Sequence, residues 1–487
     1  MRKVVYKTIR QYHRDLVDDK INCVDTVQFY LKQIEAHKKL NAFTDVFSVE
    51  ALEQAKHLDE KRIQGKPLKK LHGVVIAIKD VICYKDHTVT AASKILTGFK
   101  SLYSATAVQR LLDEEAIIIG SCNCDEFAMG SSNENSVYGP VLNAQDLTKV
   151  PGGSSGGSAV AVQAGMCMAS LGSDTGGSVR QPADFCGIIG LKPTYGRISR
   201  YGLIAYASSF DQIGIFGNTV DDLSLLLEVM SGADEFDSTA MQWAVGSEQW
   251  AVGNGQFQHS AKKYKIAYFK EALHHPSLDK EIKDKILTLI EDLKLKGHTV
   301  TEIDFELLEY VVPAYYVLTT AEASSNLNRY DGIRFGHQTR SPIKDLTEFY
   351  KQNRTAGFGK EVQRRIMLGT FVLSSGYYDA YFSKAQQVRR LLVNKTDAIF
   401  TDFDALILPT SPTTAFTIGH KSSDPVAQYL ADIFTVFANL TGIPGMSIPL
   451  FKHSNGMPFG LQIMTKKTDE LTLLQLADDL IKLQQQN

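Results

Sequence analysis

The stretch VPGGSSGGSAVAVQAGMCMASLGSDTGGSVRQP spans residues 150–182 and contains two glycine–serine clusters around an apolar segment. The clusters are GGSSGGS at 152–158 and GSDTGGS at 172–178. Glycines at this density cost backbone entropy on folding, and a flexible linker does not carry an apolar segment such as AVAVQAGMCMASLG. The stretch therefore indicates a folded site in which two turns present serines, with the apolar segment predicted as a buried helix that positions them.

Three familiar motifs resemble parts of this stretch. A phosphate-binding loop requires a lysine directly after its second glycine, and neither cluster has one. Residues 152–156 match the GxSxG nucleophile elbow, but nothing ties a downstream histidine to Ser154. Asp174-Thr175-Gly176 matches an aspartic-protease motif, whose chemistry needs two carboxylates, and no second DTG or DSG occurs. The first two interpretations are weakly supported and the third is excluded.

A lysine upstream offers another chemistry for these serines. Lys79 ends the apolar run VVIAI at 74–78, which reads as a buried strand. A serine hydroxyl needs a base to become a nucleophile, and a desolvated lysine amine can serve as that base. The alternative is a lysine that emerges from the strand end into water, and position alone favours this alternative.

The second cluster supports the catalytic interpretation. Gly176 and Gly177 precede Ser178, so the backbone can approach a bound carbonyl group closely. Together with the N–H groups of Thr175 and Ser178, those of the two glycines could form an oxyanion hole.

The composition excludes several classes of protein. The chain has 487 residues, 44% hydrophobic and 22% charged, with a formal net charge of −2, which is typical of a globular protein and not of one that binds DNA by a basic surface. We find no apolar run of transmembrane length and no signal peptide, so we expect a cytoplasmic protein without a membrane contact. Six scattered cysteines do not suggest a disulfide framework, and Cys122-Asn-Cys124 lacks the second cluster that a metal site needs.

Helical and apolar strand patterns alternate along most of the chain. This alternation predicts an α/β fold built on a large mixed central β-sheet with helices on both faces. Residues 1–65 read as a helical extension, and residues 66–487 as the main domain, with no Pro/Ser-rich linker between them. Expected strands lie within LHGVVIAIKDVI (71–82), AIIIGSCN (116–123), AKKYKIAYFK (261–270), GHTVTEID (297–304) and TDFDALILPTSP (401–412).

The lysine and the two serine clusters resemble the amidase signature family. The resemblance implies that family's α/β fold and a catalytic triad of Lys79, Ser154 and Ser178. Ser178 would be the nucleophile, and Ser154, on a cis peptide bond, would relay its proton to Lys79. Ser155, Ser158 and Ser173 would be structural, since serine hydroxyls often satisfy loop backbone groups.

Segments outside the serine region resemble one branch of that family, the A subunits of tRNA-dependent Asp/Glu amidotransferases. The resemblance implies a glutaminase that supplies ammonia to a B subunit, which amidates Glu-tRNA(Gln) or Asp-tRNA(Asn) with ATP and Mg²⁺, while a C subunit completes a heterotrimer. No cofactor or metal would be bound by this chain itself. A free-standing amidase acting on a small amide is the alternative. The segments lie at 125–140, 186–214, 321–337, 364–381 and 424–450.

A glutamine substrate needs partners for its charged groups. The resemblance makes Arg365 the candidate for the α-carboxylate, with Arg364 able to exchange roles, and Asp432 the candidate for the α-ammonium. A salt bridge on a helix surface and a helix hydrogen bond are the alternatives for Arg365 and Asp432. Weaker pocket candidates are Tyr316, otherwise a core aromatic, and Gly130 and Ser131, otherwise ordinary loop residues.

One segment departs from the family pattern. QWAVG occurs at 242–246 and again at 249–253, within a connection from Met241 to Ser260 that is longer than usual for the family. We expect a surface insertion that leaves the chemistry unchanged.

Overall fold

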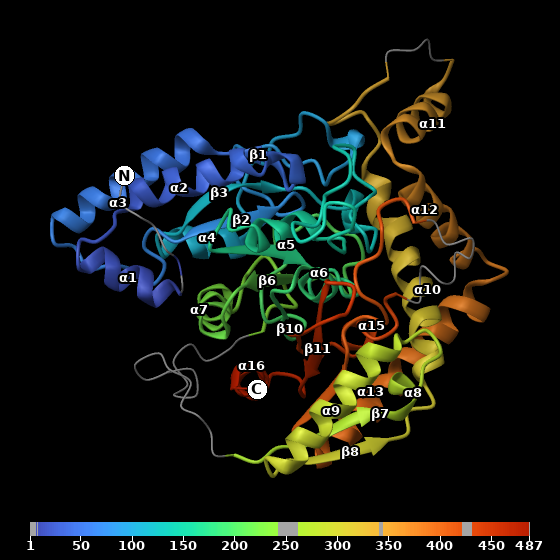
Figure 1. Ribbon diagram of the computed structural model, residues 1–487. Coiled ribbons are helices and arrows are strands. Elements are labelled where there is room, and N and C mark those ends of the chain that lie inside the picture. Colours follow the sequence, from blue (N-terminus) through green and yellow to red (C-terminus); the bar gives the residue numbers. More distant parts are fainter. Residues whose placement is uncertain (1–5, 7, 242–261, 340–343, 421–430, 487) are drawn as a thin grey trace.

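A computed structural model describes residues 6, 8–241, 262–339, 344–420 and 431–486 (Figure 1). The doubled QWAVG at 242–253 lies outside the described residues. Among those residues, no helix combines the length and apolar character needed to cross a membrane.

A single mixed sheet of eleven strands forms the centre of the structure, in the order β1-β3-β2-β4-β6-β5-β10-β11-β9-β7-β8. This sheet confirms the α/β prediction. Strand β2 runs parallel to β3 and β4, and β7 runs parallel to β8 and β9, whereas the strands between these two groups pair antiparallel. The strands are β1 (Phe43–Val46), β2 (Val75–Lys79), β3 (Ile117–Cys122), β4 (Ala169–Ser173), β5 (Ile189–Lys192), β6 (Ile213–Gly217), β7 (Lys265–Phe269), β8 (Thr299–Ile303), β9 (Ala405–Pro409), β10 (Gly445–Lys452) and β11 (Pro458–Met464).

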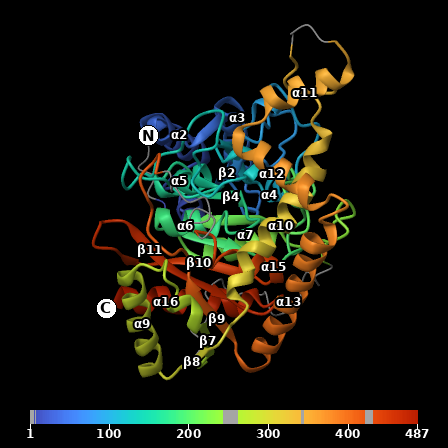
Figure 2. The same cartoon turned by 90° about the vertical axis from the view of Figure 1, so that its right-hand side faces the viewer.

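Helices pack on both faces of the sheet (Figures 1 and 2). Helices α5 and α6 pack together and against β4, β5 and β10, while α7 packs with α4 and α16. A second group, α10, α12 and α13, packs together along one side of the molecule. The helices are α1 (Ile9–Val17), α2 (Cys23–Ala36), α3 (Ser48–Ile63), α4 (Thr106–Asp113), α5 (Gly156–Gln163), α6 (Arg180–Cys186), α7 (Val220–Met230), α8 (Lys270–Leu273), α9 (Lys280–Leu295), α10 (Leu308–Asn326), α11 (Leu346–Gly357), α12 (Lys360–Val372), α13 (Lys384–Asp402), α15 (Val436–Thr441) and α16 (Glu470–Gln486).

The N-terminal segment is helical, as expected, but it also contains a strand. Strand β1 pairs antiparallel with β3, with Phe43 opposite Cys122, and so extends the sheet. The sequence did not predict this strand because four residues are too few to display a period. The division of the chain at residue 65 stays a prediction.

The apolar segment between the serine clusters is not one helix, and that expectation was wrong. Helix α5 ends at Gln163, Gly165 adopts a left-handed conformation at φ 63°, and the chain continues into β4. Glycine tolerates such a φ without strain, so it ends the helix and reverses the chain. The result places both serine clusters at the same edge of the sheet, one leading into α5 and the other leading out of β4.

Candidate active site

Lys79 is the last residue of β2 and is fully buried. Strand β4 runs parallel beside it, with Ile78 opposite Leu171, so the two strands end at the same edge of the sheet. The amine of Lys79 donates hydrogen bonds to the hydroxyls of Ser154 (2.8 Å), Ser155 (2.9 Å) and Ser173 (2.9 Å). The lysine therefore does not emerge into water.

The three hydroxyls can form hydrogen bonds with this amine in both its protonated and its neutral form. Ser155 donates its own proton to the Ser173 carbonyl oxygen at 3.1 Å, so toward Lys79 its hydroxyl can only accept. An ammonium has three N–H groups for three hydroxyl oxygens, whereas a neutral amine has two N–H groups and one lone pair. Ser154 can donate to that lone pair, and a proton can then cross between Ser154 and Lys79 without any movement of heavy atoms.

The surroundings of Lys79 also favour its neutral form. Burial lowers the pKa of its amine to about 8, and the more distant carboxylates of Asp125 and Asp174 oppose this shift only in part. None of the hydrogen-bonding partners of the amine is a carboxylate. A substantial fraction of the amine is therefore neutral at a slightly alkaline pH.

The two serine clusters lie against each other. The Gly153–Ser154 peptide bond is cis, and the N–H of Ser155 donates to the Ser178 carbonyl oxygen at 3.3 Å. Ser154 is fully buried, whereas Ser178 is 8% exposed. Of the residues proposed for the triad, Ser178 is thus the one that a ligand can reach.

The turn before Ser178 requires its two glycines. A Cβ atom on Gly176 would lie 2.4 Å from the Tyr315 hydroxyl, and one on Gly177, at φ 124°, would lie 2.3 Å from Thr435 Oγ1. The Gly177 N–H donates to Asp174 Oδ1 at 2.8 Å and so is not free to bind an oxyanion.

Three other N–H groups of this turn are free for a ligand. Those of Thr175, Gly176 and Ser178 have no acceptor among the described residues. The Thr175 hydroxyl donates to Asp211 Oδ1 at 2.7 Å and fixes the turn from the side.

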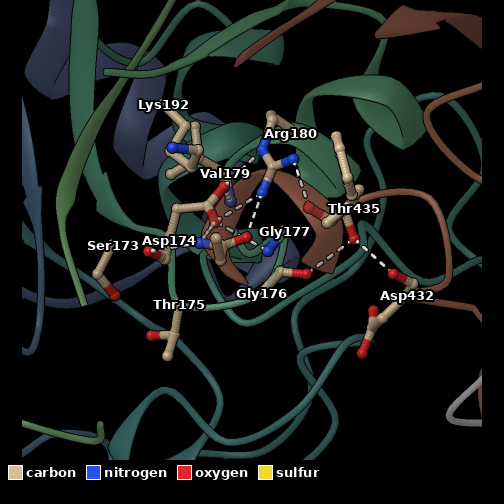
Figure 3. Close-up of polar contacts among 12 residues, drawn as sticks. Ser173, Asp174, Thr175, Gly176, Gly177, Val179, Arg180, Lys192, Asp432 and Thr435 are labelled. Carbon is tan, nitrogen blue, oxygen red and sulfur yellow. Dashed lines mark hydrogen bonds and ion pairs between the residues drawn. The ribbon is translucent and has the colours of Figure 1, made fainter. Parts of the chain in front are cut away.

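A buried ion pair supports the nucleophile turn (Figure 3). Arg180 donates to both carboxylate oxygens of Asp174, at 3.0 and 3.1 Å, and both residues are fully buried. Arg180 also donates to the Thr435 carbonyl oxygen at 2.7 Å and to Asn439 Oδ1 at 2.6 Å. The guanidinium holds the pKa of Asp174 well below its usual range, although burial acts in the opposite direction.

Arg365 lies on α12 with its guanidinium turned inward, and it is 7% exposed. Its Nε donates to Glu361 at 2.9 Å, and its Nη1 donates to the Tyr206 hydroxyl at 2.9 Å. The guanidinium also lies over the rings of Tyr206 and Tyr316, 5.5 and 5.4 Å from their centroids. Arg364 is largely exposed and pairs with Glu361, so it does not exchange roles with Arg365.

Tyr316 connects Arg365 to Asp432. The Tyr316 hydroxyl donates to Asp432 Oδ2 at 3.1 Å. Burial raises the pKa of Asp432 to about 7, against the opposing effect of Arg365. The Thr435 hydroxyl lies 3.1 Å from the Asp432 carbonyl oxygen and donates to that of Gly176 at 2.8 Å (Figure 3). The structure thus brings the three substrate candidates together beside the nucleophile turn.

Gly130 and Ser131 belong to a loop that packs on the first serine cluster. Asp125 organises this loop, because its carboxylate accepts the N–H groups of Asn133 and Asn135 at 2.9 and 3.0 Å. A Cβ atom on Gly130 would lie 2.3 Å from the Asp125 carboxyl carbon. The Asp125 N–H in turn donates to the Ser154 carbonyl oxygen at 3.1 Å. The loop of Gly130 and Ser131 is therefore near the serines.

Sequence reasoning missed several residues that build the site. Asp174 was considered only as part of a protease motif, although its position between the two serines, six residues before Arg180, was a usable signal. Ser155 and Ser173 contact the lysine directly, and the Ser155 hydroxyl also satisfies the backbone N–H and carbonyl groups of Ser173. Tyr206, Thr435 and Asn439 lie far from the serine stretch in sequence, and no local pattern marked them.

Comparisons with known proteins show what the whole chain resembles. A family model described as Amidase matches residues 25–474. The A subunit of glutamyl-tRNA(Gln) amidotransferase from Koribacter versatilis is 49% identical over 452 residues, which cover 92% of each chain. The protein of the same name from Chlorobium limicola is 48% identical over 463 residues, covering 95% of this chain and 96% of its own.

Solved structures show the same fold. The crystal structure of the A subunit of glutamyl-tRNA(Gln) amidotransferase from Thermotoga maritima is 37% identical and has a TM-score of 0.77, covering 98% of this chain and 95% of its own. A crystal structure described as amidase is 26% identical with a TM-score of 0.81, covering 98% and 99% of the two chains. The mixed sheet with its helices is thus the fold of amidase-family enzymes.

Proposed function

The chain belongs to the amidase family, and from that premise we propose that it is the glutamine-hydrolysing A subunit of a tRNA-dependent amidotransferase. The observation that carries this proposal is the buried amine of Lys79 among three serine hydroxyls, beside a turn with free N–H groups. Nearly full-length identity of 45–49% to proteins named as the A subunits of such amidotransferases favours this function over a free-standing amidase.

We propose that Ser178 attacks the side-chain amide of glutamine. Its hydroxyl proton passes to Ser154 as Ser154 releases its own proton to the neutral amine of Lys79. The N–H groups of Thr175, Gly176 and Ser178 would stabilise the oxyanion that forms on the amide oxygen. This set leaves out Gly177, one of the four N–H groups that the sequence suggested, because the N–H of Gly177 is donated to Asp174.

The same groups complete the reaction by moving the proton in the opposite direction. Lys79 returns its proton through Ser154 to the amide nitrogen, the C–N bond breaks, and ammonia leaves a glutamyl ester on Ser178. Water then attacks this ester, with Lys79 again accepting a proton through Ser154. Lys79 returns that proton through Ser154 to the Ser178 oxygen as the ester C–O bond breaks and glutamate is released. Every proton in this scheme is held or moved by Lys79, Ser154 and Ser178.

We propose that Arg365 and Asp432 recognise the α-groups of the substrate. Among the described residues, no carboxylate outside α12 forms an ion pair with the guanidinium of Arg365, and its charge suits the α-carboxylate. The α-ammonium would lie against Asp432 and lower its pKa, so that the carboxylate is ionised in the complex. Tyr316, Gly130 and Ser131 would complete the walls of the pocket.

The ammonia would be used by a B subunit that amidates Glu-tRNA(Gln), Asp-tRNA(Asn) or both in the cytoplasm, with ATP and Mg²⁺ at its own site and a C subunit in the heterotrimer. A surface feature supports a partner protein. Large apolar side chains gather on the outer face of α12 and the turn after it, each at least 40% exposed, and such patches are typical of protein interfaces. The members are Met367, Leu368, Phe371, Tyr377, Tyr378 and Tyr381.

The test is to replace Ser178 by alanine and to measure amidation of charged tRNA by the assembled enzyme with two nitrogen donors. We expect Ser178→Ala to abolish glutamine-dependent amidation, by about 10⁴-fold, and to spare amidation with added ammonium, which bypasses the glutaminase. Ser158→Ala is the matched control, because Ser158 is buried within α5 and donates to the Leu171 carbonyl oxygen instead of contacting Lys79. Loss of both activities in Ser178→Ala would refute this division of labour.

A further inference from the structure

Glu126 is a buried carboxylate that the proposed mechanism does not use. It lies in the short helix η3 (Glu126–Ala128) and is 6% exposed. In the part of the chain that the structure describes, no lysine or arginine forms an ion pair with it, and its partners are Ser93 and Gly359. Burying a carboxylate costs free energy unless N–H and O–H groups donate hydrogen bonds to it. The donors to Glu126 therefore indicate its role.

One donor is the start of α12. The N–H of Gly359 donates to both oxygens of Glu126, at 2.8 and 3.1 Å. Gly359 is the residue before α12 and has no side chain with which to cap the helix. Glu126 therefore caps α12 from a position 233 residues earlier in the sequence, and burial raises the pKa of its carboxyl group to about 7.

The contact is closely fitted. A Cβ atom on Gly359 would lie 2.3 Å from Glu126 Oε2, so a larger residue there would displace the carboxylate. The Ser93 hydroxyl is the second donor to Glu126, and it also lies 3.3 Å from the Gly357 carbonyl oxygen at the end of α11. Glu126 and Ser93 thus hold the turn that joins α11 to α12.

The position of α12 decides where Arg365 lies. Glu361 stands in the first turn of the helix and accepts a hydrogen bond from Arg365 Nε at 2.9 Å. The guanidinium extends from there to the Tyr206 hydroxyl. A shift of the first turn would move Glu361 and, with it, the guanidinium.

Asp125, the residue before Glu126, contacts the serine cluster. Asp125 donates its N–H to the Ser154 carbonyl oxygen at 3.1 Å and orders the loop of Gly130 through its carboxylate. The pair Asp125-Glu126 therefore joins the serine cluster on one side to the helix of Arg365 on the other.

We propose that Glu126 is a positioning residue that sets the Arg365 guanidinium, through the N-terminus of α12, at the correct distance from Ser178 to receive the α-carboxylate of glutamine. This inference rests on the proposed glutaminase function. It assigns Glu126 to substrate recognition and not to the proton transfers at Lys79.

The test is Glu126→Gln in the assembled enzyme, with ammonia release measured from two substrates. Glutamine carries the α-carboxylate, and 4-aminobutanamide is the same molecule without it. We expect Glu126→Gln to lower kcat/KM for glutamine about fivefold, mainly through KM, as for the loss of one capping interaction. The kcat/KM for 4-aminobutanamide should stay within about twofold, because that substrate does not need Arg365. Glu53→Gln is the matched control, since Glu53 is exposed on α3.

A purely structural role for Glu126 would lower kcat/KM for both substrates equally and would overturn the proposal. A second measurement decides the matter if 4-aminobutanamide is turned over too slowly. In an Arg365→Ala background the effect of Glu126→Gln on glutamine should vanish, and an undiminished effect there would refute the proposal. Absence of glutamine hydrolysis in the wild-type enzyme would instead contradict the proposed function itself.

Discussion

Two cations are fully buried within the site, and their surroundings give them opposite properties. Lys79 is bonded to three neutral hydroxyls, and burial lowers its pKa to about 8. Arg180 is bonded to the carboxylate of Asp174, and that pair lowers the pKa of the carboxyl. A buried cation without a carboxylate partner can give up its proton, whereas one with such a partner stays charged and holds the structure together.

The short stretch at 150–182 supplies both the nucleophile Ser178 and the ion pair that holds it in place. Asp174 accepts N–H groups of Gly177 and Val179, which flank Ser178, so the ion pair fixes the turn on which the nucleophile stands. The lysine pocket, by contrast, must let a proton enter and leave. The two regions therefore differ in what a substitution should destroy, which is activity at Lys79 and stability at Arg180.

The largest expected effect is the loss of glutaminase activity in Lys79→Met. Methionine has a similar length and no base, so kcat for ammonia release should fall by about 10⁴-fold while the protein stays folded. Steady-state ammonia release and thermal unfolding, measured on the same preparations, check this. Lys192→Met is the matched control, because Lys192 is also fully buried but donates to the carbonyl oxygens of Pro193 and Ile443. A similar loss of activity in both variants would remove the distinction between the two regions.

The next effect is on stability. Arg180→Met leaves the Asp174 carboxylate buried without its cation, so the free energy of unfolding should fall by about 3–5 kcal/mol. Urea denaturation measures this change. Lys294→Met removes an exposed cation that pairs with Glu291 at 2.9 Å, and it should cost less than about 1 kcal/mol. A loss as small as that in Arg180→Met would show that the pair does not support the turn.

The sequence predicted the surroundings of Lys79 better than the ion pair of Arg180 and Asp174. The apolar strand before Lys79 and the glycine-rich turns that carry the serines can be recognised from short stretches of sequence. The resemblance to the family then named the triad. The contacts around Asp174 were missed because Thr435 and Asn439 lie more than 250 residues away in sequence. Long-range contacts, among them the pairing of β10 with β5, bring their segment to the turn. The strand at 169–173 was not predicted because an alanine-rich apolar segment is equally typical of a helix. The roles of Arg365 and Asp432 needed the resemblance, since a helix-surface arginine has the same local pattern.

The smallest expected effect concerns the pH dependence of the base. Lys79 must be neutral to accept a proton, so kcat/KM should rise with pH through about 8 and then level off. Ser173 accepts a hydrogen bond from the amine at 2.9 Å and so stabilises the ammonium. Ser173→Ala removes that acceptor, lowers the pKa of Lys79 further, and should move the rise to lower pH by about half a unit.

The pH profiles of wild type and Ser173→Ala should be measured side by side with glutamine. Asp432, whose pKa is raised to about 7, affects both profiles alike, so the difference between them isolates the lysine. A shift to higher pH would mean that the Ser173 hydroxyl donates to the neutral amine instead of accepting from the ammonium. Ser154 would then not be the hydroxyl that faces the lone pair, and the proton would have to leave Ser178 by another route. The direction of this small shift therefore decides which serine stands between the nucleophile and its base.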